Sequence, residues 1–151
     1  MGKPLHKVLH PYDETKIVNA IVSAERMCSG EFAVHVEGRC PDREPIKRAQ
    51  TLMTKLGIHR TRERNAVLFY VATHERRGAI LGDTGIGEDP KSEFWQEAFS
   101  RMQIGLRRGA IGDAVVAAIM SVAQRMAPRF PRQANDANEV DNEISTDPAY
   151  V

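Results

Sequence analysis

Residues 65–88, NAVLFYVATHERRGAILGDTGIGE, predict a β-hairpin followed by a loop rich in Gly and carboxylates. Residues 66–73 are almost wholly apolar, which a strand tolerates only when other elements cover both of its faces. The charged residues 74–77 form the turn, and residues 79–81 return as a partner strand. We therefore expect this hairpin to lie at the centre of an α/β sheet.

Apolar residues at helical or alternating spacing predict the elements around the hairpin. We expect a helix over Asp13–Cys28, a strand over 32–38 that Glu31 opens, a helix from Pro45 to Gly57, and helices over Ser92–Arg107 and Asp113–Met126. This order is typical of an α/β/α three-layer sandwich with a small mixed sheet. The helical crossover makes the first two strands parallel, and the hairpin makes the third antiparallel to the second.

The two ends of the chain lack such periodicity. Residues 1–12 are interpreted as a flexible lead-in, residues 13–130 as the folded domain, and residues 131–151 as an acidic tail that is extended or disordered. Within the domain, Trp95 and Phe99 are interpreted as core anchors.

Composition excludes several classes of function. The formal net charge is +1, so there is no overall field that would attract nucleic acid or an anionic membrane. The start of the sequence has no apolar run typical of a signal peptide, and no later run is long enough to span a bilayer, so we expect a cytoplasmic protein without membrane insertion. Cys28 and Cys40 lack zinc or disulfide spacing and are expected to be reduced thiols.

The histidines offer little support for a metal centre. His6 and His10 lie four residues apart, but prolines flank them and no carboxylate joins them, so metal binding is not favoured there. His35 lies on the less apolar face of its strand and is interpreted as a packed or solvated side chain.

The predicted topology brings three segments to one edge of the sheet. The starts of the first two strands and the end of the third meet there, so Glu31, the segment Arg62–Asn65 and the loop Gly82–Asp89 should converge. The loop contributes Gly82, Asp83, Glu88 and Asp89. Carboxylate and carbonyl oxygens of this kind are the ligands of hard cations, which predicts a Ca²⁺ or Mg²⁺ site completed by Glu31.

Two alternatives remain open for this edge. The loop is equally compatible with a solvated turn whose acidic residues cap the following helix. Similarly, the run HRTRERN at 59–65 is usual for a solvated loop, while Arg62 and Arg64 could bind an anion such as phosphate. The loop matches no P-loop, dinucleotide fingerprint or EF-hand pattern, and no catalytic nucleophile is marked.

Short motifs in this order resemble the TPM domain family. They are Ser29-Gly30-Glu31 before a strand, Leu56-Gly57 before a charged loop, Arg64-Asn65 entering an apolar strand, Gly82-x-x-Gly85-Ile86 after the third strand, and Phe94-Trp95 on a helix. The resemblance covers about residues 13–130, and the stretch FPRQANDANEVDNEIS is similar to the tails of small bacterial members. Two departures stand out, since Ala66 follows Asn65 where many members have Gly, and an extra Gly87 precedes Glu88.

The resemblance implies an α/β/α sandwich, divalent-cation binding through Gly82, Asp83, Glu88 and Glu31, and the acid phosphatase activity of a plant member. We therefore carry two hypotheses. The first is a divalent-cation-binding domain that acts through a protein partner, a membrane protein at its cytoplasmic face being one candidate. The alternative is a metal-dependent phosphatase of low turnover, in which the metal activates water and an Arg neutralises developing charge.

Overall fold

The computed structural model describes residues 3–134 and 138–151. Its main elements are α1 (Pro11–Met27), β1 (Glu31–Glu37), α2 (Pro45–Lys55), β2 (Ala66–Ala72), β3 (Arg77–Gly82), α3 (Glu93–Arg107) and α4 (Ile111–Met126). Short 3₁₀ helices, Pro4–Lys7, Thr84–Ile86 and Pro148–Tyr150, lie near the two ends and after β3. The order of the main helices and strands is the predicted one.

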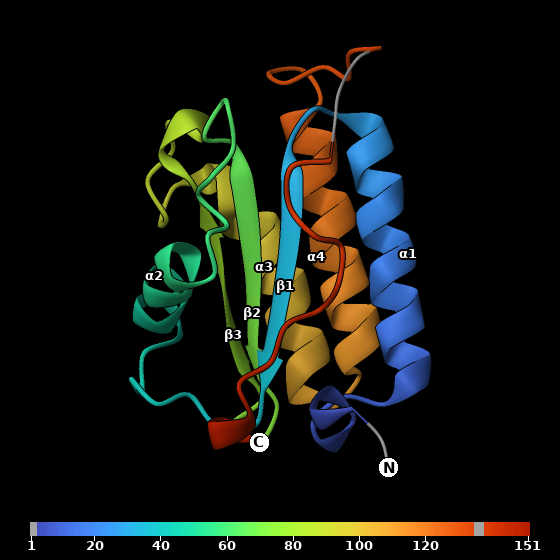
Figure 1. Ribbon diagram of the computed structural model, residues 1–151, viewed down its shortest axis with the longest axis vertical. Helices are drawn as coiled ribbons and strands as arrows, with labels where there is room; N and C mark the ends of the chain where they lie inside the picture. Colours follow the sequence, from blue (N-terminus) through green and yellow to red (C-terminus); the bar gives the residue numbers. More distant parts are fainter. Residues whose placement is uncertain (1–2, 135–137) are drawn as a thin grey trace.

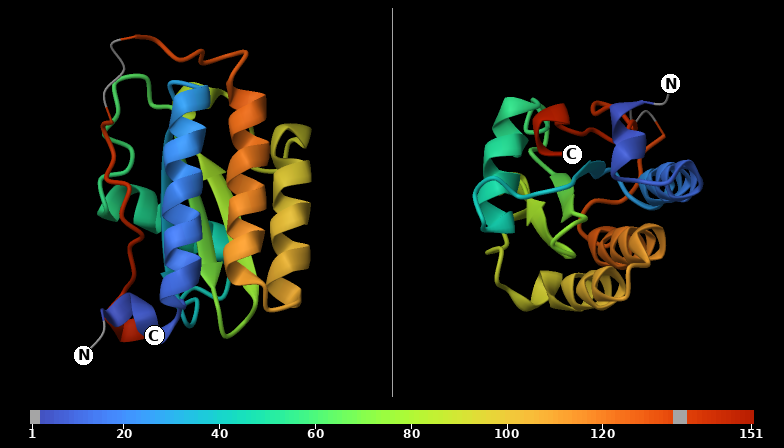
Figure 2. Two further views of the ribbon diagram at one scale, coloured as in Figure 1. Left: turned by 90° about the vertical axis from the view of Figure 1, so that its right-hand side faces the viewer. Right: turned by 90° about the horizontal axis from the view of Figure 1, so that it is seen from below.

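The strands form a mixed sheet in the order β1-β2-β3. β1 runs parallel to β2, with Glu31 opposite Ala66, and β3 runs antiparallel to β2, with Gly82 opposite Val67. Helices α1, α4 and α3 lie side by side over one face of the sheet, and α2 covers the other face (Figures 1 and 2). The predicted α/β/α sandwich is confirmed.

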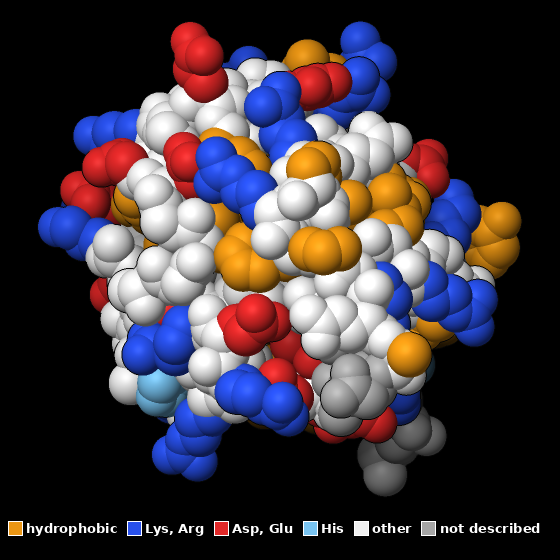
Figure 3. Space-filling view, turned by 90° about the horizontal axis from the view of Figure 1, so that it is seen from above, with side chains coloured by type: hydrophobic (Ala, Val, Ile, Leu, Met, Phe, Trp, Pro, Cys, Tyr) orange, Lys and Arg blue, Asp and Glu red, His pale blue; other side chains and the backbone are white. Residues whose placement is uncertain are grey.

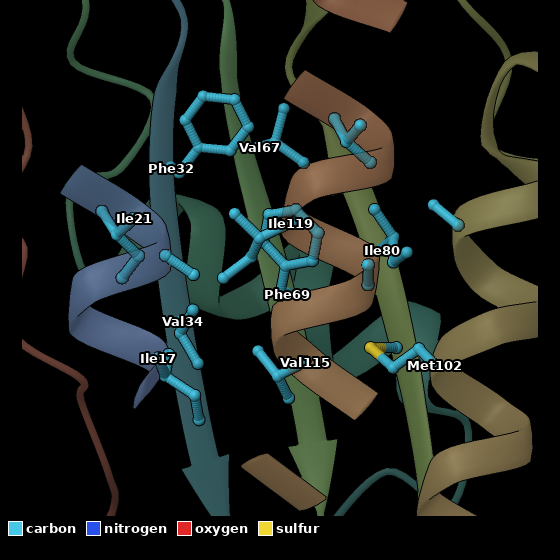
Figure 4. Close-up of a cluster of buried hydrophobic side chains, with 14 of the residues drawn as sticks. Ile17, Ile21, Phe32, Val34, Val67, Phe69, Ile80, Met102, Val115 and Ile119 are labelled. Carbon is cyan, nitrogen blue, oxygen red and sulfur yellow. The ribbon is translucent and has the colours of Figure 1, made fainter. Parts of the chain in front are cut away.

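The alternation of side chains along the strands explains these layers. Phe32, Val34, Val67 and Phe69 point toward α1 and α4, where they join a core that includes Ile119 (Figure 4). The intervening residues pack against α2 in a second, smaller core: Ala33, Leu68, Tyr70 and Leu81 meet Ala49 and Leu52. Every residue of β2 is buried, as expected for a central strand covered on both faces.

Helix α3 approaches β3 closely because β3 contains glycines on that side. A Cβ at Gly82 would lie 2.4 Å from the Trp95 ring, and a Cβ at Gly78 would lie 2.9 Å from the Met102 methyl group. Trp95 is only 1% exposed, as predicted for a core anchor. The same prediction is wrong for Phe99, which is 36% exposed. Phe99 lies at the margin of the buried stripe, beyond the last strand, where no further element of the described chain covers it.

The segment before α1 packs onto the body of the domain. Leu5, Val8 and Leu9 are buried in the larger core, and α1 begins at Pro11, two residues before the predicted Asp13. A flexible lead-in over residues 1–12 therefore does not describe residues 3–12. His6 and His10 act locally, since His6 Nε2 lies 2.8 Å from Glu14 and His10 caps the first turn of α1.

The C-terminal tail is extended and runs along β1 (Figure 1). Ser145 donates to the Val34 oxygen at 3.0 Å and accepts from the Val36 nitrogen at 2.9 Å, which forms a parallel β-bridge opposite His35. Ile144 is buried beside it. The tail thus covers the outer edge of β1.

Two further predictions concern single features. Cys28 and Cys40 are buried free thiols. In the described part of the chain, no helix combines the length and the apolar character that crossing a membrane requires.

Candidate functional site

The loop after β3 lies directly against the start of β2. Asp83 donates its backbone N–H to the Ala66 oxygen at 2.9 Å, and Gly85 donates to the Arg64 oxygen at 2.7 Å. Gly85 must be a glycine, because a Cβ there would lie 1.9 Å from the Glu63 oxygen. Figure 3 views this end of the molecule and shows acidic and basic side chains next to one another across it.

Asp83 is held by Arg64. The Arg64 guanidinium donates to both carboxylate oxygens of Asp83, at 2.6 and 2.9 Å, and the Thr84 N–H donates to one of them at 2.7 Å. The carboxylate raises the pKa of Arg64 through these hydrogen bonds. Asp83 is buried and caps the 3₁₀ helix that starts at Thr84. The Asp83 carboxylate thus holds the loop in its conformation.

The other acidic residues of the loop also have partners. Glu88 forms an ion pair with Arg129 at 2.8 Å and accepts from the Ser92 hydroxyl at 2.9 Å, and the hydrogen bond from Arg129 lowers the pKa of Glu88. Asp89 accepts the Lys91 N–H at 2.8 Å. Asp83 caps the 3₁₀ helix within the loop, but no side-chain hydrogen bond caps α3 at Ser92, so the alternative of acidic residues that cap the following helix is met only in part. A cation site at Gly82, Asp83, Glu88 and Asp89 stays a prediction.

Glu31 lies at the same end of the sheet but faces away from that loop, toward α1. It meets Glu25, and both side chains are buried, at 3% and 8% exposure. Glu31 Oε1 accepts the Glu139 N–H at 2.8 Å. The Oε2 atom of each glutamate has no hydrogen-bond partner among the described residues other than the neighbouring carboxyl group.

Burial dominates the ionisation of this pair. Desolvation and the neighbouring Glu31 charge raise the pKa of Glu25 to about 8. Desolvation likewise raises the pKa of Glu31. The two carboxylates line a cavity of about 200 Å³. It is also lined by Ser29, Arg132, Asn138 and Asn142, and the Asn138 amide donates to the Asn142 side-chain oxygen at 3.0 Å.

Arg62 and Arg64 occupy different settings. Arg64 is bound by Asp83, as described above. The Arg62 side chain is exposed, and its backbone N–H donates to the Glu139 carboxylate at 3.1 Å. Both residues lie at the end of the sheet where Glu31 begins β1. This position is compatible with binding an anion, which stays a prediction.

Sequence reasoning missed a buried polar network on the α2 face. Glu37 accepts two hydrogen bonds from Arg48, both at 2.9 Å, and one from the Tyr70 hydroxyl at 2.6 Å, while His35 Nε2 lies 2.8 Å away. Burial opposes ionisation of Glu37, but the hydrogen bonds from His35, Arg48 and Tyr70 outweigh it and lower its pKa to about 2. His35 is thus a packed side chain within this network.

The network also fastens the tail. His35 Nδ1 lies 2.8 Å from the Ser145 hydroxyl, Arg48 contacts Asp147 at 3.3 Å, and the Arg48 guanidinium lies 5.2 Å from the centre of the Tyr150 ring. Each contact joins β1 or α2 to the extended segment. The network therefore has a structural role in holding that segment in place.

Sequence reasoning also missed Glu25, although its position in α1 indicates that it is buried. It lies four residues after Ile21, on the stripe of α1 that faces the sheet. A carboxylate on a buried stripe requires a partner or a raised pKa. Glu25 could therefore have been flagged, but its partner comes from β1 and lies beyond the range of local pattern.

Comparison with known proteins places this fold in a family. The layers and mixed sheet define a small α/β/α domain, and the family model for the TPM domain matches residues 5–125. The chain belongs to the TPM domain family.

Two solved structures resemble this chain. BA42 from the psychrophilic bacterium Bizionia argentinensis is 31% identical, with a TM-score of 0.83, over 92% of this chain and 95% of that one. The N-terminal domain of cg2496 from Corynebacterium glutamicum shares the fold at 16% identity, with a TM-score of 0.63, over 88% of this chain and 84% of that one. A search of the curated proteins found no match.

Proposed function

We propose that this TPM domain binds a divalent cation, Ca²⁺ or Mg²⁺, and acts through a protein partner. One observation carries the cation part of the proposal. Glu25 and Glu31 are buried side by side, and the Oε2 atom of each has no partner among the described residues other than the neighbouring carboxyl group.

Two adjacent buried carboxylates require compensation. Either they retain a proton, as the raised pKa of Glu25 indicates, or they bind a positive ion. Carboxylate oxygens suit a hard cation, and Asn138 and Asn142, whose side chains are hydrogen bonded to each other at 3.0 Å, line the same cavity. No group of three or more His, Cys, Asp or Glu side chains gathers among the described residues, so water molecules would complete the coordination of an ion held by these two carboxylates.

Arg132 limits how the ion can be accommodated. It lines the same cavity and donates to the backbone oxygen of Glu25 at 2.6 Å. A divalent cation near this guanidinium is repelled by it, so the affinity should be modest. We therefore expect Arg132→Gln to increase the affinity for the cation if the ion binds in this cavity. The same substitution should not change the affinity if the ion binds in the loop at 82–89.

The test is a titration of chelator-stripped protein with Ca²⁺ and then Mg²⁺, recorded as backbone amide spectra. We expect saturable shifts at Glu25, Glu31 and Asn142, and their loss in Glu31→Gln. The matched control is Glu14→Gln on the same helix, which should leave the shifts intact. If neither ion moves any amide at millimolar concentration, cation binding is refuted.

The same titration separates the two candidate positions for the ion. Asp83→Asn should not change the shifts if the ion lies between Glu25 and Glu31. If the shifts instead cluster at residues 82–89, persist in Glu31→Gln and disappear in Asp83→Asn, the ion binds in the loop and the Glu25–Glu31 site is refuted.

A low-turnover phosphatase is the alternative proposal. It is favoured by one observation, that Arg62 and Arg64 lie at the end of the sheet where Glu31 begins β1. The test is hydrolysis of an aryl phosphate with each metal in turn. Hydrolysis that is lost in both Glu31→Gln and Arg62→Gln supports this alternative, and its absence with every metal refutes it. A membrane protein at its cytoplasmic face remains one candidate for the partner of a non-catalytic domain.

A further inference from the structure

We propose that the open edge of β3 binds an extended acidic segment of a partner protein, which joins the sheet as an added strand. This inference names a partner class for the protein-interaction role proposed above. It does not require the cation site, because β3 lies at the opposite edge of the sheet from β1 and Glu31.

The backbone of β3 has free hydrogen-bonding groups along that edge. Asp83 donates to Ala66 directly opposite, so the odd-numbered residues of β3 face β2. The alternation then directs the N–H and C=O groups of Gly78 and Ile80 away from β2. No other strand pairs with β3 in the described part of the chain. An extended peptide can therefore continue the ladder.

A groove runs along this edge between α2 and α3. Its volume is about 870 Å³, and its apolar lining residues include Ile46, Phe99 and the buried Ile80 and Trp95, of which Phe99 is the most exposed. Phe99 is the residue whose exposure contradicted its predicted place in the core. An added strand directs alternate side chains toward α2 and toward α3, and apolar side chains on the α3 side would cover Phe99.

The charges around the groove select the partner. Arg76, Arg77, Lys91 and Arg107 all line it and are exposed. No salt bridge joins any of them to a carboxylate among the described residues.

The acidic residues at the groove already have partners within the chain. Glu44 lies 3.4 Å from Lys47, and Glu75 accepts the Cys40 N–H at 2.9 Å. The groove therefore presents an excess of positive charge. An acidic segment complements it, whereas a second copy of this chain would bring the same cations together and be repelled.

The other edge of the sheet already contains this kind of contact. The tail that pairs with β1 through Ser145 is extended and acidic, with Glu139, Asp141 and Glu143 just before the bridge. The sheet thus accepts an acidic extended segment within its own chain. At β3 no such segment of the described chain is present, so this edge is open to a segment of a partner protein.

The first experiment measures binding of a labelled synthetic peptide that alternates Glu with Val, by fluorescence anisotropy. Trp95 is the only tryptophan and lines the groove, so its emission should change at the same midpoint. Arg107→Glu should weaken binding about fivefold to tenfold. The matched control Arg108→Glu makes the same charge change one residue away, outside the groove lining, and should leave the affinity within about twofold.

The second experiment tests the added strand itself. The same peptide with N-methyl groups on alternate residues keeps its charge but loses donors to β3, and it should not bind. A peptide with Lys in place of Glu should not bind either. Equal binding of the N-methylated peptide would overturn the proposal, as would binding that is unchanged in Arg107→Glu.

Two other occupants would also overturn the proposal. Sedimentation that shows dimers, with Trp95 emission depending on protein concentration, would assign the groove to a second copy. Displacement of the peptide by a single-stranded oligonucleotide at lower concentration than by unlabelled peptide would assign it to nucleic acid. We expect the peptide affinity to be the same with Ca²⁺ and with a chelator, so failure here and failure of the cation site are distinguishable.

Discussion

The two edge strands of this small sheet are treated differently. The outer edge of β1 is covered by the tail, which bridges to it at Ser145 and is fastened by Arg48. The outer edge of β3 has no neighbouring strand in the described chain, and a groove with basic side chains lies beside it. Unpaired strand edges invite association with other chains. The domain therefore covers the edge of β1 with its own acidic segment, whereas the edge of β3 is unpaired and has basic side chains beside it.

This difference gives the polar side chains at the two edges separate roles. At β1, buried polar side chains hold an internal segment in one position, so their removal should destabilise the fold. At β3, exposed cations and a half-exposed aromatic contribute little to the fold, so their removal should affect binding instead. The following predictions test that division.

The largest effect is expected from Arg48→Met. This change leaves Glu37 buried without its ion-pair partner and removes the contact to Asp147. An uncompensated buried charge should lower the free energy of unfolding by about 3–5 kcal/mol, measured by urea denaturation. Arg101→Met, an exposed residue paired with Glu97, is the control and should change little. A loss in Arg48→Met no larger than in the control would show that the network does not hold the β1 edge.

The pH dependence of stability should reflect two glutamates near the β1 edge that are shifted in opposite directions. The pKa of Glu25 is raised from 4.5 to about 8, so the folded state retains a proton that the unfolded chain releases between these values. Stability should therefore fall as pH rises from about 4.5 to 8, by about 2–4 kcal/mol in the presence of a chelator.

Glu37 acts in the opposite sense at lower pH. Its pKa is lowered from 4.5 to about 2. Its contribution to the free energy of unfolding is therefore complete above pH 4.5 and is lost as pH falls toward 2. Unfolding in urea across this range should give a maximum near pH 4.5. Glu25→Gln should flatten the slope above the maximum and leave the acid limb unchanged. A slope that persists in Glu25→Gln would show that another group causes it.

Much of the fold was predictable, because local patterns carry it. The fully buried β2 and the apolar stripes of the four helices, α2 included, required helices on both faces of a mixed sheet, and that prediction is confirmed. The exposure of Phe99 was not predictable in the same way. Spacing places Phe99 near the apolar stripe of α3. Whether a strand packs against that position depends on which strand lies at the edge of the sheet.

The candidate site was less predictable, since it depends on contacts between distant segments. Glu31 was selected from its place at the start of a strand, but its partner Glu25 is brought to it by the packing of α1. Asp83 and Arg64 were each selected for binding, and the structure joins them to each other. Likewise, the charged tail has few apolar residues, so composition alone did not indicate that it pairs with β1.

A smaller effect is expected from Ser145→Pro. Proline removes the N–H that donates to the Val34 oxygen and leaves that acceptor unsatisfied. The free energy of unfolding should fall by about 2 kcal/mol, and the Val36 amide, which donates to Ser145, should exchange with solvent faster. Ser145→Ala keeps the backbone bonds and loses the hydroxyl contact to His35, so it should cost about 1 kcal/mol. Slow Val36 exchange in the proline variant would contradict a closed β1 edge that depends on this bridge.

The smallest effect on stability is expected at the open edge, from Phe99→Ala. Because Phe99 is 36% exposed beside an unpaired strand, the cost of truncation should be about 1 kcal/mol or less. Met102→Ala, one turn along the same helix and fully buried, should cost about 2–5 kcal/mol. The alternating Glu and Val peptide should bind Phe99→Ala severalfold more weakly, because the apolar floor of the groove is lost. A large loss of stability with unchanged peptide affinity would mean that Phe99 belongs to the core after all, and that the two edges differ less than their contacts indicate.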